Sequence, residues 1–388
     1  MEDVMKSSRL LALGMFLSAA ISSHGAFAAV DAGAAVVKLR TNCTEGGVTL
    51  NNCFITMSDV VNWITTTRIP KASANSPLLV EIGPGTFNRL VLTCNATQGF
   101  TGYISFVGAG VSQTTIQHDD FNLPVVQIDS CTHLSFADLR ISGLGYNYIV
   151  WNGGGISSWR NVEVDTPARA WVEEQCGATK GSHYWFASRI LTREVFTIGD
   201  GYNASCDESW FFGSEITVSR TGTGFFNLRP LVASGNGEIH VYGGVIRALA
   251  SYQPNSNVGT LRAAVATSGG KIHIHGTGID QISTFANNIV ALSASSGGMI
   301  HANASAYNLT TGGSATIKRI NKDTDPLTHV HAPYLWEEHP NPPNIASVTG
   351  ADMAMVTSGT SDGHPHLVVY DSTCASKWYD TVDKACRP

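Results

Sequence analysis

The segment Gly237-Glu238-Ile239-His240-Val241-Tyr242 has two further copies downstream, and the three align without gaps. The later copies are Gly270-Lys271-Ile272-His273-Ile274-His275 and Gly298-Met299-Ile300-His301-Ala302-Asn303. In each copy a glycine suited to a turn precedes a short segment with apolar residues at every second position. This alternation is typical of a β-strand with one buried face. Repetition at this spacing predicts a solenoid in which each copy forms one rung.

Weaker copies extend the repeat toward the N-terminus. In one common register the central apolar residues are Leu139, Val162, Ile190, Ile216, Ile239, Ile272 and Ile300. They are 23 to 33 residues apart without an amphipathic helical pattern between them, so βαβ units are not expected. We therefore predict an all-β protein, a parallel β-helix over residues 78–320 whose coils stack around an apolar core. The alternative is a β-sandwich, whose strands recur faster, about every 8 to 12 residues.

The first coils resemble a known family. The likeness is carried by Leu78-Leu79-Val80-Glu81-Ile82-Gly83-Pro84-Gly85-Thr86-Phe87, by Tyr103-Ile104-Ser105-Phe106-Val107-Gly108-Ala109-Gly110 and by Thr114-Thr115-Ile116. These segments are similar to the first coils of the pectin-lyase-like superfamily, most of all to those of pectin methylesterases, and the resemblance covers roughly residues 45–320. It implies a right-handed coil and a short helix closing its N-terminal end, expected here between Met57 and Thr66.

The catalytic motifs of that superfamily are missing. The sequence contains neither the Gln-Asp-Thr segment nor the Gly-x-Val-Asp-Phe-Ile-Phe-Gly segment of pectin methylesterases, and it lacks the Trp-x-Asp-His signature of pectate lyases. Of the polygalacturonase motifs it has only an Asp-Asp pair, Asp119-Asp120, which lies outside the expected site. The resemblance is therefore specific for the fold and not for a reaction.

Segments on either side of the repeats complete the expected domain organisation. Lys6 and Arg9 precede an apolar run that ends near Ile21, and small residues follow at Ala26 and Ala28, so residues 1–28 are expected to be a signal peptide. The run is shorter than the roughly 20 apolar residues of a membrane span, so we expect a secreted protein without a span after cleavage, in the extracellular space, the periplasm or at the cell surface. The remaining expected parts are an N-terminal cap at 29–77, a proline-rich extended segment at 321–351 and a β-hairpin cap at 352–388.

The eight cysteines all follow the expected signal peptide, and an even number in an exported chain favours disulfide bonds. Spacing does not determine connectivity. We expect neighbours in the sequence to pair: Cys43 with Cys53, Cys94 with Cys131, Cys176 with Cys206, and Cys374 with Cys386.

The charge balance argues against one class of partner. The chain has 24 Lys+Arg against 30 Asp+Glu, a net charge of −6 and no basic run, so we expect no nucleic-acid partner.

Outward-facing residues of the predicted strands supply a first candidate site. Arg140, Glu163 and Asp165 are expected on adjacent rungs, where two carboxylates could divide acid and base roles beside an arginine. Arg189 and Arg193 nearby are expected to bind substrate. The alternative is a surface ladder of ion pairs without a catalytic role.

A second candidate site consists of imidazoles. His240, His273, His301 and His275, with Tyr242 beside them, are expected to contact a glycan, or else to be ordinary solvent-facing strand residues. We expect no metal and no cofactor, because a linear ladder fits the tetrahedral coordination of zinc poorly.

Aromatic residues are concentrated between about residues 150 and 210. Exposed rings could stack on sugars, whereas buried ones would pack successive coils; the candidates are Trp151, Trp159, Trp171, Tyr184, Trp185 and Trp210. The function expected from the sequence is a secreted β-helix protein that binds an extracellular, uronic-acid-type polysaccharide, and the sequence leaves open whether it also cleaves or de-esterifies it. If it is an enzyme, it is expected to be a polysaccharide lyase, glycoside hydrolase or carbohydrate esterase. The alternative is a non-catalytic adhesin or envelope protein.

Overall fold

The computed structural model describes residues 35–332 apart from short gaps at 46, 69, 119, 121–122, 144–148, 168, 176–179, 195–197, 221–226, 252–258, 285–286 and 313–316. Toward the C-terminus it describes 338–339, 353–356, 366–370, 378–380 and 384–386. The expected signal peptide at 1–28 lies outside these residues and stays a prediction. None of the helices in the described ranges is long and apolar enough to cross a membrane.

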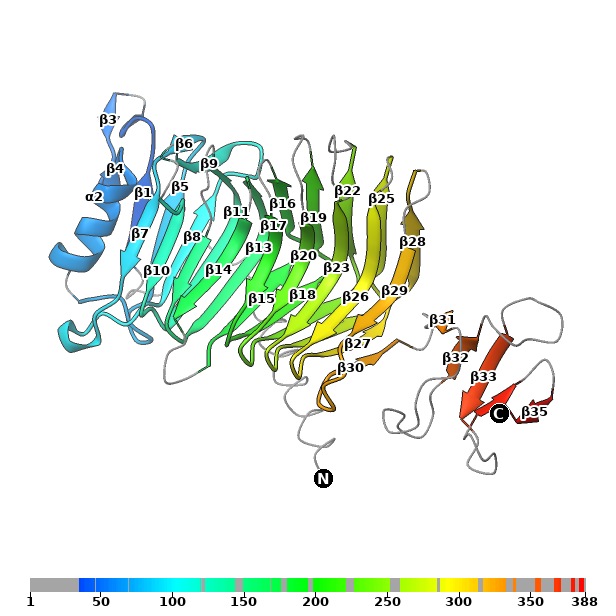
Figure 1. The fold of residues 1–388 in the computed structure, drawn as a ribbon. Helices are drawn as coiled ribbons and strands as arrows, with labels where there is room; N and C mark the ends of the chain where they lie inside the picture. The colour runs from blue at the N-terminus through cyan, green and yellow to red at the C-terminus, as the bar shows by residue number, and fades with distance from the viewer. Residues whose placement is uncertain are drawn as a thin grey trace.

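The chain forms stacked coils of parallel strands, as predicted (Figure 1). Each coil contributes up to three strands, which we assign to three faces. The first face contains β5 (Leu78–Ile82), β8 (Ile104–Gly108), β15 (Ser182–Phe186), β18 (Glu208–Phe212), β21 (Glu238–Tyr242), β24 (Lys271–His275), β27 (Met299–Asn303) and β30 (His329–His331). The second face contains β6 (Gly85–Phe87), β9 (Thr114–His118), β16 (Arg189–Glu194), β19 (Glu215–Arg220), β22 (Val245–Ala250), β25 (Gly278–Ser283) and β28 (Ala306–Thr310).

The third face is a separate nine-stranded sheet. It contains β7 (Leu90–Thr93), β10 (Val126–Asp129), β12 (Ile149–Asn152), β14 (Arg169–Gln175), β17 (Ile198–Ala204), β20 (Asn227–Ala233), β23 (Thr260–Thr267), β26 (Asn288–Ser295) and β29 (Ile317–Lys322). Two long strands, β11 (His133–Gly143) and β13 (Ile156–Thr166), pair with strands of both the first and the second face. These two faces are therefore adjacent and joined.

The aligned segments form consecutive rungs of the first face. Ile239, Ile272 and Ile300 are paired from strand to strand and are 0% exposed, so they stack in the core as predicted. The glycine that opens each segment has a steric role, because a Cβ atom at Gly270 would overlap the backbone of Ala233 in the preceding coil. Gly237 and Gly298 meet backbone of the preceding coil in the same way.

The single register expected for seven apolar residues is wrong in two respects, the first being that Ile190 pairs with Val164 and not with Val162. All seven are buried, which confirms the inward phase, but they belong to two faces. Ile190 pairs with Val164 and Ile216 with Ile246 on the second face, whereas Ile239 lies on the first. In six of the coils the bend between the two faces lies at a residue with a left-handed backbone: Asp138, Asn161, Ala187, Gly213, Gly243 and Gly276.

Aromatic side chains fill the interior of the middle coils. Phe136, Trp159 and Trp185 stack with centroid separations of 4.0 Å and 4.7 Å, and each is at most 1% exposed. Trp151 and Trp171 are equally buried. These four tryptophans are therefore packing residues, whereas Tyr184 and Trp210 lie on the outer surface of the first face.

A short helix lies at the N-terminal end of the stack (Figure 1). Helix α2 (Met57–Asn62) begins after Thr56, whose hydroxyl accepts a hydrogen bond from the backbone N–H of Asp59, and continues into the π-helical turn Trp63–Thr67. Its Met57 and Val60 are buried in the core. The expected helix is thus present. Earlier in the chain, β2 (Thr44–Glu45) and β3 (Val48–Thr49) form a short hairpin.

The stack is longer than residues 78–320. Strand β1 (Ala35–Leu39) pairs in parallel with β5 and with β4 (Cys53–Phe54), so part of the expected cap belongs to the stack. At the other end β30 pairs with β27, which carries the stack to His331. The proline-rich segment therefore begins with a further rung.

The C-terminal region is more than the expected hairpin. Its strands are β31 (Glu338–His339), β32 (Met353–Val356), β33 (His366–Tyr370), β34 (Trp378–Asp380) and β35 (Ala385–Cys386), and they form one five-stranded sheet. Within the described segments this sheet has no strand pairing to the stack. A capping role for it stays a prediction.

Two of the expected disulfides are confirmed, Cys43–Cys53 and Cys94–Cys131. Cys206 and Cys386 are also disulfide-bonded. Their expected partners, Cys176 and Cys374, lie outside the described residues, so those two pairings stay predictions.

Candidate functional site

The two candidate clusters lie on different faces. Arg140, Glu163 and Asp165 are on the second face, in the second halves of β11 and β13. His240 and His273 are on the first face, in β21 and β24. The sequence analysis expected both clusters in one outward-facing row of residues, and this is wrong. Each coil bends between its first-face strand and its second-face strand, so the two clusters belong to different series of strands.

The second-face cluster is a continuous ladder of ion pairs. Arg140 pairs with Asp165 and, over 3.2 Å, with Glu163. Arg189 contacts the other oxygen of Glu163 at 2.9 Å, and Arg193 contacts Asp165 at 3.1 Å. The five expected residues are thus together, and each carboxylate is held by two arginines.

The same alternation continues along the second face. Glu215 accepts from Arg189 at 3.2 Å and from Arg247 at 2.8 Å, and Arg247 also pairs with Asp280 at 3.2 Å. Burial raises the pKa of Glu215, but the hydrogen bonds from Thr217 and Arg189 and the charges of the arginines outweigh it, so that its pKa is lowered. The pattern fits the ion-pair ladder considered as the alternative reading of this cluster.

The first face carries two rows of rings on its outer surface. In parallel in-register strands, side chains at equivalent positions lie one rung apart and stack. The first row contains Tyr184, Trp210, His240, His273 and His301, and the second contains Phe186, Phe212, Tyr242 and His275. The closest pair is Trp210 and His240, with centroids 3.9 Å apart and planes 7° apart. His301 departs from the row, since its ring is edge-on to that of His273.

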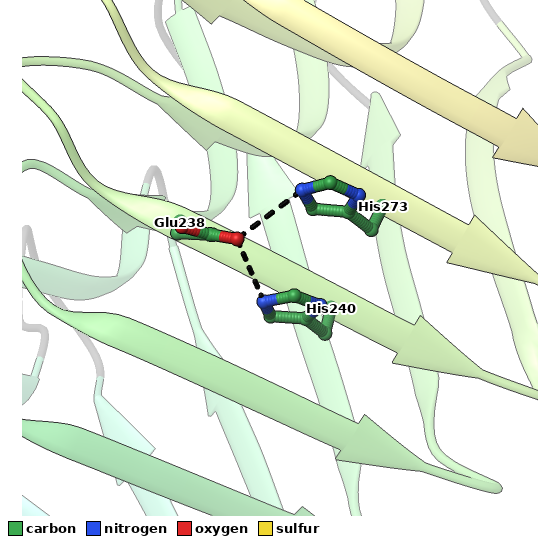
Figure 2. Close-up of side chains that lie close together, drawn as sticks. All are labelled: Glu238, His240 and His273. Carbon is green, nitrogen blue, oxygen red and sulfur yellow. Dashed lines mark ion pairs between the residues drawn. The ribbon is translucent and has the colours of Figure 1, made fainter. Parts of the chain in front are cut away.

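At the centre of the first row, two imidazoles meet a carboxylate (Figure 2). Oε1 of Glu238 lies 3.1 Å from Nε2 of His240 and 3.2 Å from Nε2 of His273. Oε1 of Glu208, one rung earlier, lies 3.3 Å from the same nitrogen of His240. Both Nε2 atoms are buried, and neither has the geometry of a hydrogen bond. These three side chains are the described group that could hold a metal ion.

The members of this cluster shift one another's pKa values. The side chains of His240 and His273 hold the pKa of Glu238 well below its ordinary value, against the effect of burial. Burial lowers the pKa of His240, but the carboxylates of Glu208 and Glu238 outweigh it and the pKa is raised. Burial and the neighbouring imidazoles lower the pKa of His301 to about 4. In the first row, therefore, the pKa of His240 is raised whereas that of His301, two rungs away, is lowered.

Burial also shifts pKa values in the second row. It lowers the pKa of His275, with the charges of His273 and His240 adding to the effect, and it raises the pKa of Tyr242 together with the two glutamates. All expected first-face residues, His240, Tyr242, His273, His275 and His301, are thus brought together.

Several residues of this site were missed from the sequence. Glu238 lies two residues before His240 and so faces the same side, a relationship that strand alternation alone could have found. Glu208 pairs with Glu238, but its strand is too unlike the aligned segments to be recognised. Apart from this site, the sequence contains a Gly-x-Ser-x-Gly segment, Gly359-Thr360-Ser361-Asp362-Gly363, which lies outside the described residues.

A serine, a histidine and an aspartate also meet inside the core. Ser157 Oγ is 2.7 Å from Nδ1 of His183, whose Nε2 is 3.1 Å from Oδ2 of Asp207. The three residues are 0%, 0% and 4% exposed. A substrate cannot reach them in this conformation, so we interpret them as a buried polar network between the tryptophans.

Comparisons with known proteins give little further information. No family model matches the chain, and no curated protein matches it. Among solved structures, the chain is similar to the A-module of the Azotobacter vinelandii mannuronan C-5 epimerase AlgE6, at 13% identity and a TM-score of 0.26. The similarity covers 65% of this chain and 92% of that one, and at this score it says nothing about the function of this protein.

Proposed function

We propose that the protein is a secreted solenoid that binds an extracellular, uronic-acid-type polysaccharide along the first face. The observation that carries the proposal is the pair of ring rows that follow this face over successive rungs. Rings offer apolar contact to sugars, while the hydroxyl of Tyr242 and the imidazole of His275, both only partly buried, offer polar contact at their edges. A regular row of such groups suits a polymer better than a small ligand.

The adjacent second face supports an acidic polymer. The side chains of Arg189 and Arg193 are 53% and 62% exposed, although both are ion-paired. A guanidinium has five N–H donors, so each arginine retains donors for a sugar carboxylate. Arg189 follows Phe186 of the second ring row by three residues, with the bend at Ala187 between them.

The ion pairs favour binding without cleavage. Glu163 and Asp165 are each held by two arginines. Neither can reach a glycosidic oxygen as a proton donor without breaking these pairs, which favours the non-catalytic alternative over a lyase, hydrolase or esterase. The proposal also takes the coil to be right-handed and related to the pectin-lyase-like superfamily, with α2 and the C-terminal sheet covering its ends.

Binding assays on the chain from residue 29 onward test the proposal. The protein is titrated calorimetrically with polygalacturonate, pectin, alginate and neutral glucans, and products are assayed as unsaturated ends, reducing ends and methanol. We expect at least one uronan to bind, with affinity reduced at least about tenfold in the double variant Tyr242→Ser/His275→Ser. Thr260→Ser, on the third face, is the matched control and should bind as the wild type does.

Two results would contradict the proposal. One is the absence of binding across the panel by folded protein, and the other is equal binding by the wild type and the double variant. Product release that disappears in Glu163→Gln would replace binding alone with catalysis on the second face.

A further inference from the structure

We propose that Glu238, His240 and His273 form a binding site for one divalent transition-metal ion of the zinc class. The site goes beyond the proposed glycan binding and does not depend on it. Two imidazole nitrogens and one carboxylate oxygen are ligands that zinc and its neighbours in the first transition row accept.

The spacing of the donor atoms suits such an ion. In a tetrahedral site with bonds of about 2.0–2.1 Å, two donor atoms are roughly 3.3 Å apart. The two distances from Glu238 Oε1 to the imidazole nitrogens are 3.1 Å and 3.2 Å, and all three donor atoms lie within 4.8 Å of one another. Only the separation between the two nitrogens has to shorten.

The unsatisfied nitrogens are a second, independent observation. Nε2 of His240 and Nε2 of His273 are both buried and make no hydrogen bond, although each faces the Glu238 oxygen. His240 as a whole is only 9% exposed. Each nitrogen has a carboxylate oxygen at ion-pair distance but no aligned hydrogen bond, which is costly for a buried polar atom, and a shared cation would satisfy both nitrogens and the carboxylate at once.

One ring must tilt for both nitrogens to bind the same ion. The two imidazole planes are 8° from parallel with centroids 4.7 Å apart, whereas an imidazole binds a metal in its own plane. His240 is held against Trp210, so the movement falls to His273, whose side chain is 21% exposed. Its other neighbour, His301, meets it edge-on, with ring centroids 5.3 Å apart, and does not stack on it.

Nearby charges are compatible with a cation. Glu208 Oε1, 3.3 Å from Nε2 of His240, is placed to provide a fourth ligand, and water could do so instead. The competing positive group is Lys271, whose Nζ is 3.8 Å from the other oxygen of Glu238 and whose side chain is 41% exposed. Lys271 can therefore turn toward solvent when an ion binds.

Zinc titration of chelator-treated protein tests the site. Calorimetry at pH 8 should give one equivalent of bound Zn²⁺, and Co²⁺ should give the intense visible bands of a four- or five-coordinate ion. His240→Gln, His273→Gln and Glu238→Gln should each weaken the zinc affinity at least about 100-fold, since even outer-shell changes around metals cost about 10- to 100-fold. His275→Gln and His301→Gln are matched controls and should retain the wild-type affinity.

One measurement needs no variant and so tests the site even if a variant fails to fold. X-ray absorption on the zinc-loaded wild type should show two imidazoles in the coordination shell. Absence of zinc binding, a shell without two imidazoles, or affinity lost in His301→Gln but kept in His273→Gln would each overturn the site.

Discussion

The ring of His240 lies flat against the indole of Trp210, with centroids 3.9 Å apart and planes 7° apart. This contact joins the aromatic part of the first ring row to its imidazole part. The indole fixes the orientation of His240, and the carboxylates of Glu208 and Glu238 meet its Nε2 from two rungs. A hydrophobic stack thus positions a polar cluster at the surface of the first face.

Because Ile272 points into the core and His275 points outward, substitutions at these two positions of one strand should differ strongly in their effect on stability. Ile272→Asp places an unpaired charge between Ile239 and Ile300, and we expect it to lower the free energy of unfolding by about 4 kcal/mol or more. His275→Ser, on the outer surface of the same strand, should change it by no more than about 0.5 kcal/mol. Urea unfolding, monitored by circular dichroism, measures the unfolding free energy of both variants. Comparable losses in the two would contradict the assignment of Ile272 to the core side of the strand.

The turn glycines predict a second contrast. Gly270→Ala brings a Cβ into the backbone of Ala233, and we expect a loss of about 1–3 kcal/mol in unfolding free energy. Gly276→Asn is the matched control, because its φ of +59° suits asparagine and nothing lies within 4 Å of the added Cβ. Thermal unfolding should rank Gly270→Ala well below Gly276→Asn; the reverse order would contradict the close approach of successive coils.

The buried Ser157, His183 and Asp207 network predicts a structural cost without a binding effect. His183→Leu leaves Asp207 with one partner fewer in the core, and we expect about 3 kcal/mol of destabilisation. His183→Gln, which retains hydrogen-bonding capacity, should cost less. Both are measured by denaturant unfolding. A variant with normal stability but lost glycan binding would show that the network belongs to a functional site.

The imidazole His301 predicts a pH effect on stability. Its folded pKa of about 4 lies below the ordinary value of 6.5, so the unfolded chain binds the proton more tightly. Its contribution to stability is therefore present above about pH 6.5 and is lost as the pH falls toward 4. Between pH 7 and 5 we expect the wild type to lose about 1–2 kcal/mol more than His301→Asn does, in the presence of chelator. Parallel pH curves for the two proteins would contradict this.

The sequence predicted the stacked architecture because apolar residues alternate with outward residues in each rung. Ile239, Ile272 and Ile300 carry this signal clearly. The division into faces was not predictable, because the bend between them occupies one residue whose type varies from Asn161 to Ala187 to Gly213. No common residue marks where one strand series ends and the next begins.

The site was predicted only in part for a related reason. Histidines recur in the aligned copies and were found, whereas Glu238 was present in the first copy and was not assigned to their side of the strand. Glu208 belongs to a rung without the repeat pattern, so only the strand pairing reveals it. The core residue His183 has no sequence signal that separates it from the outward-facing histidines of the first face.

Hydroxyl-radical footprinting in the presence of a bound uronan tests the proposed function most directly. The account predicts that protection by the polymer falls on the first face, at Trp210, Tyr242 and His275, while Arg262 and Lys318 on the third face react as they do without polymer. Protection of the third face, or a bound polymer that leaves the ring rows as reactive as before, would contradict it.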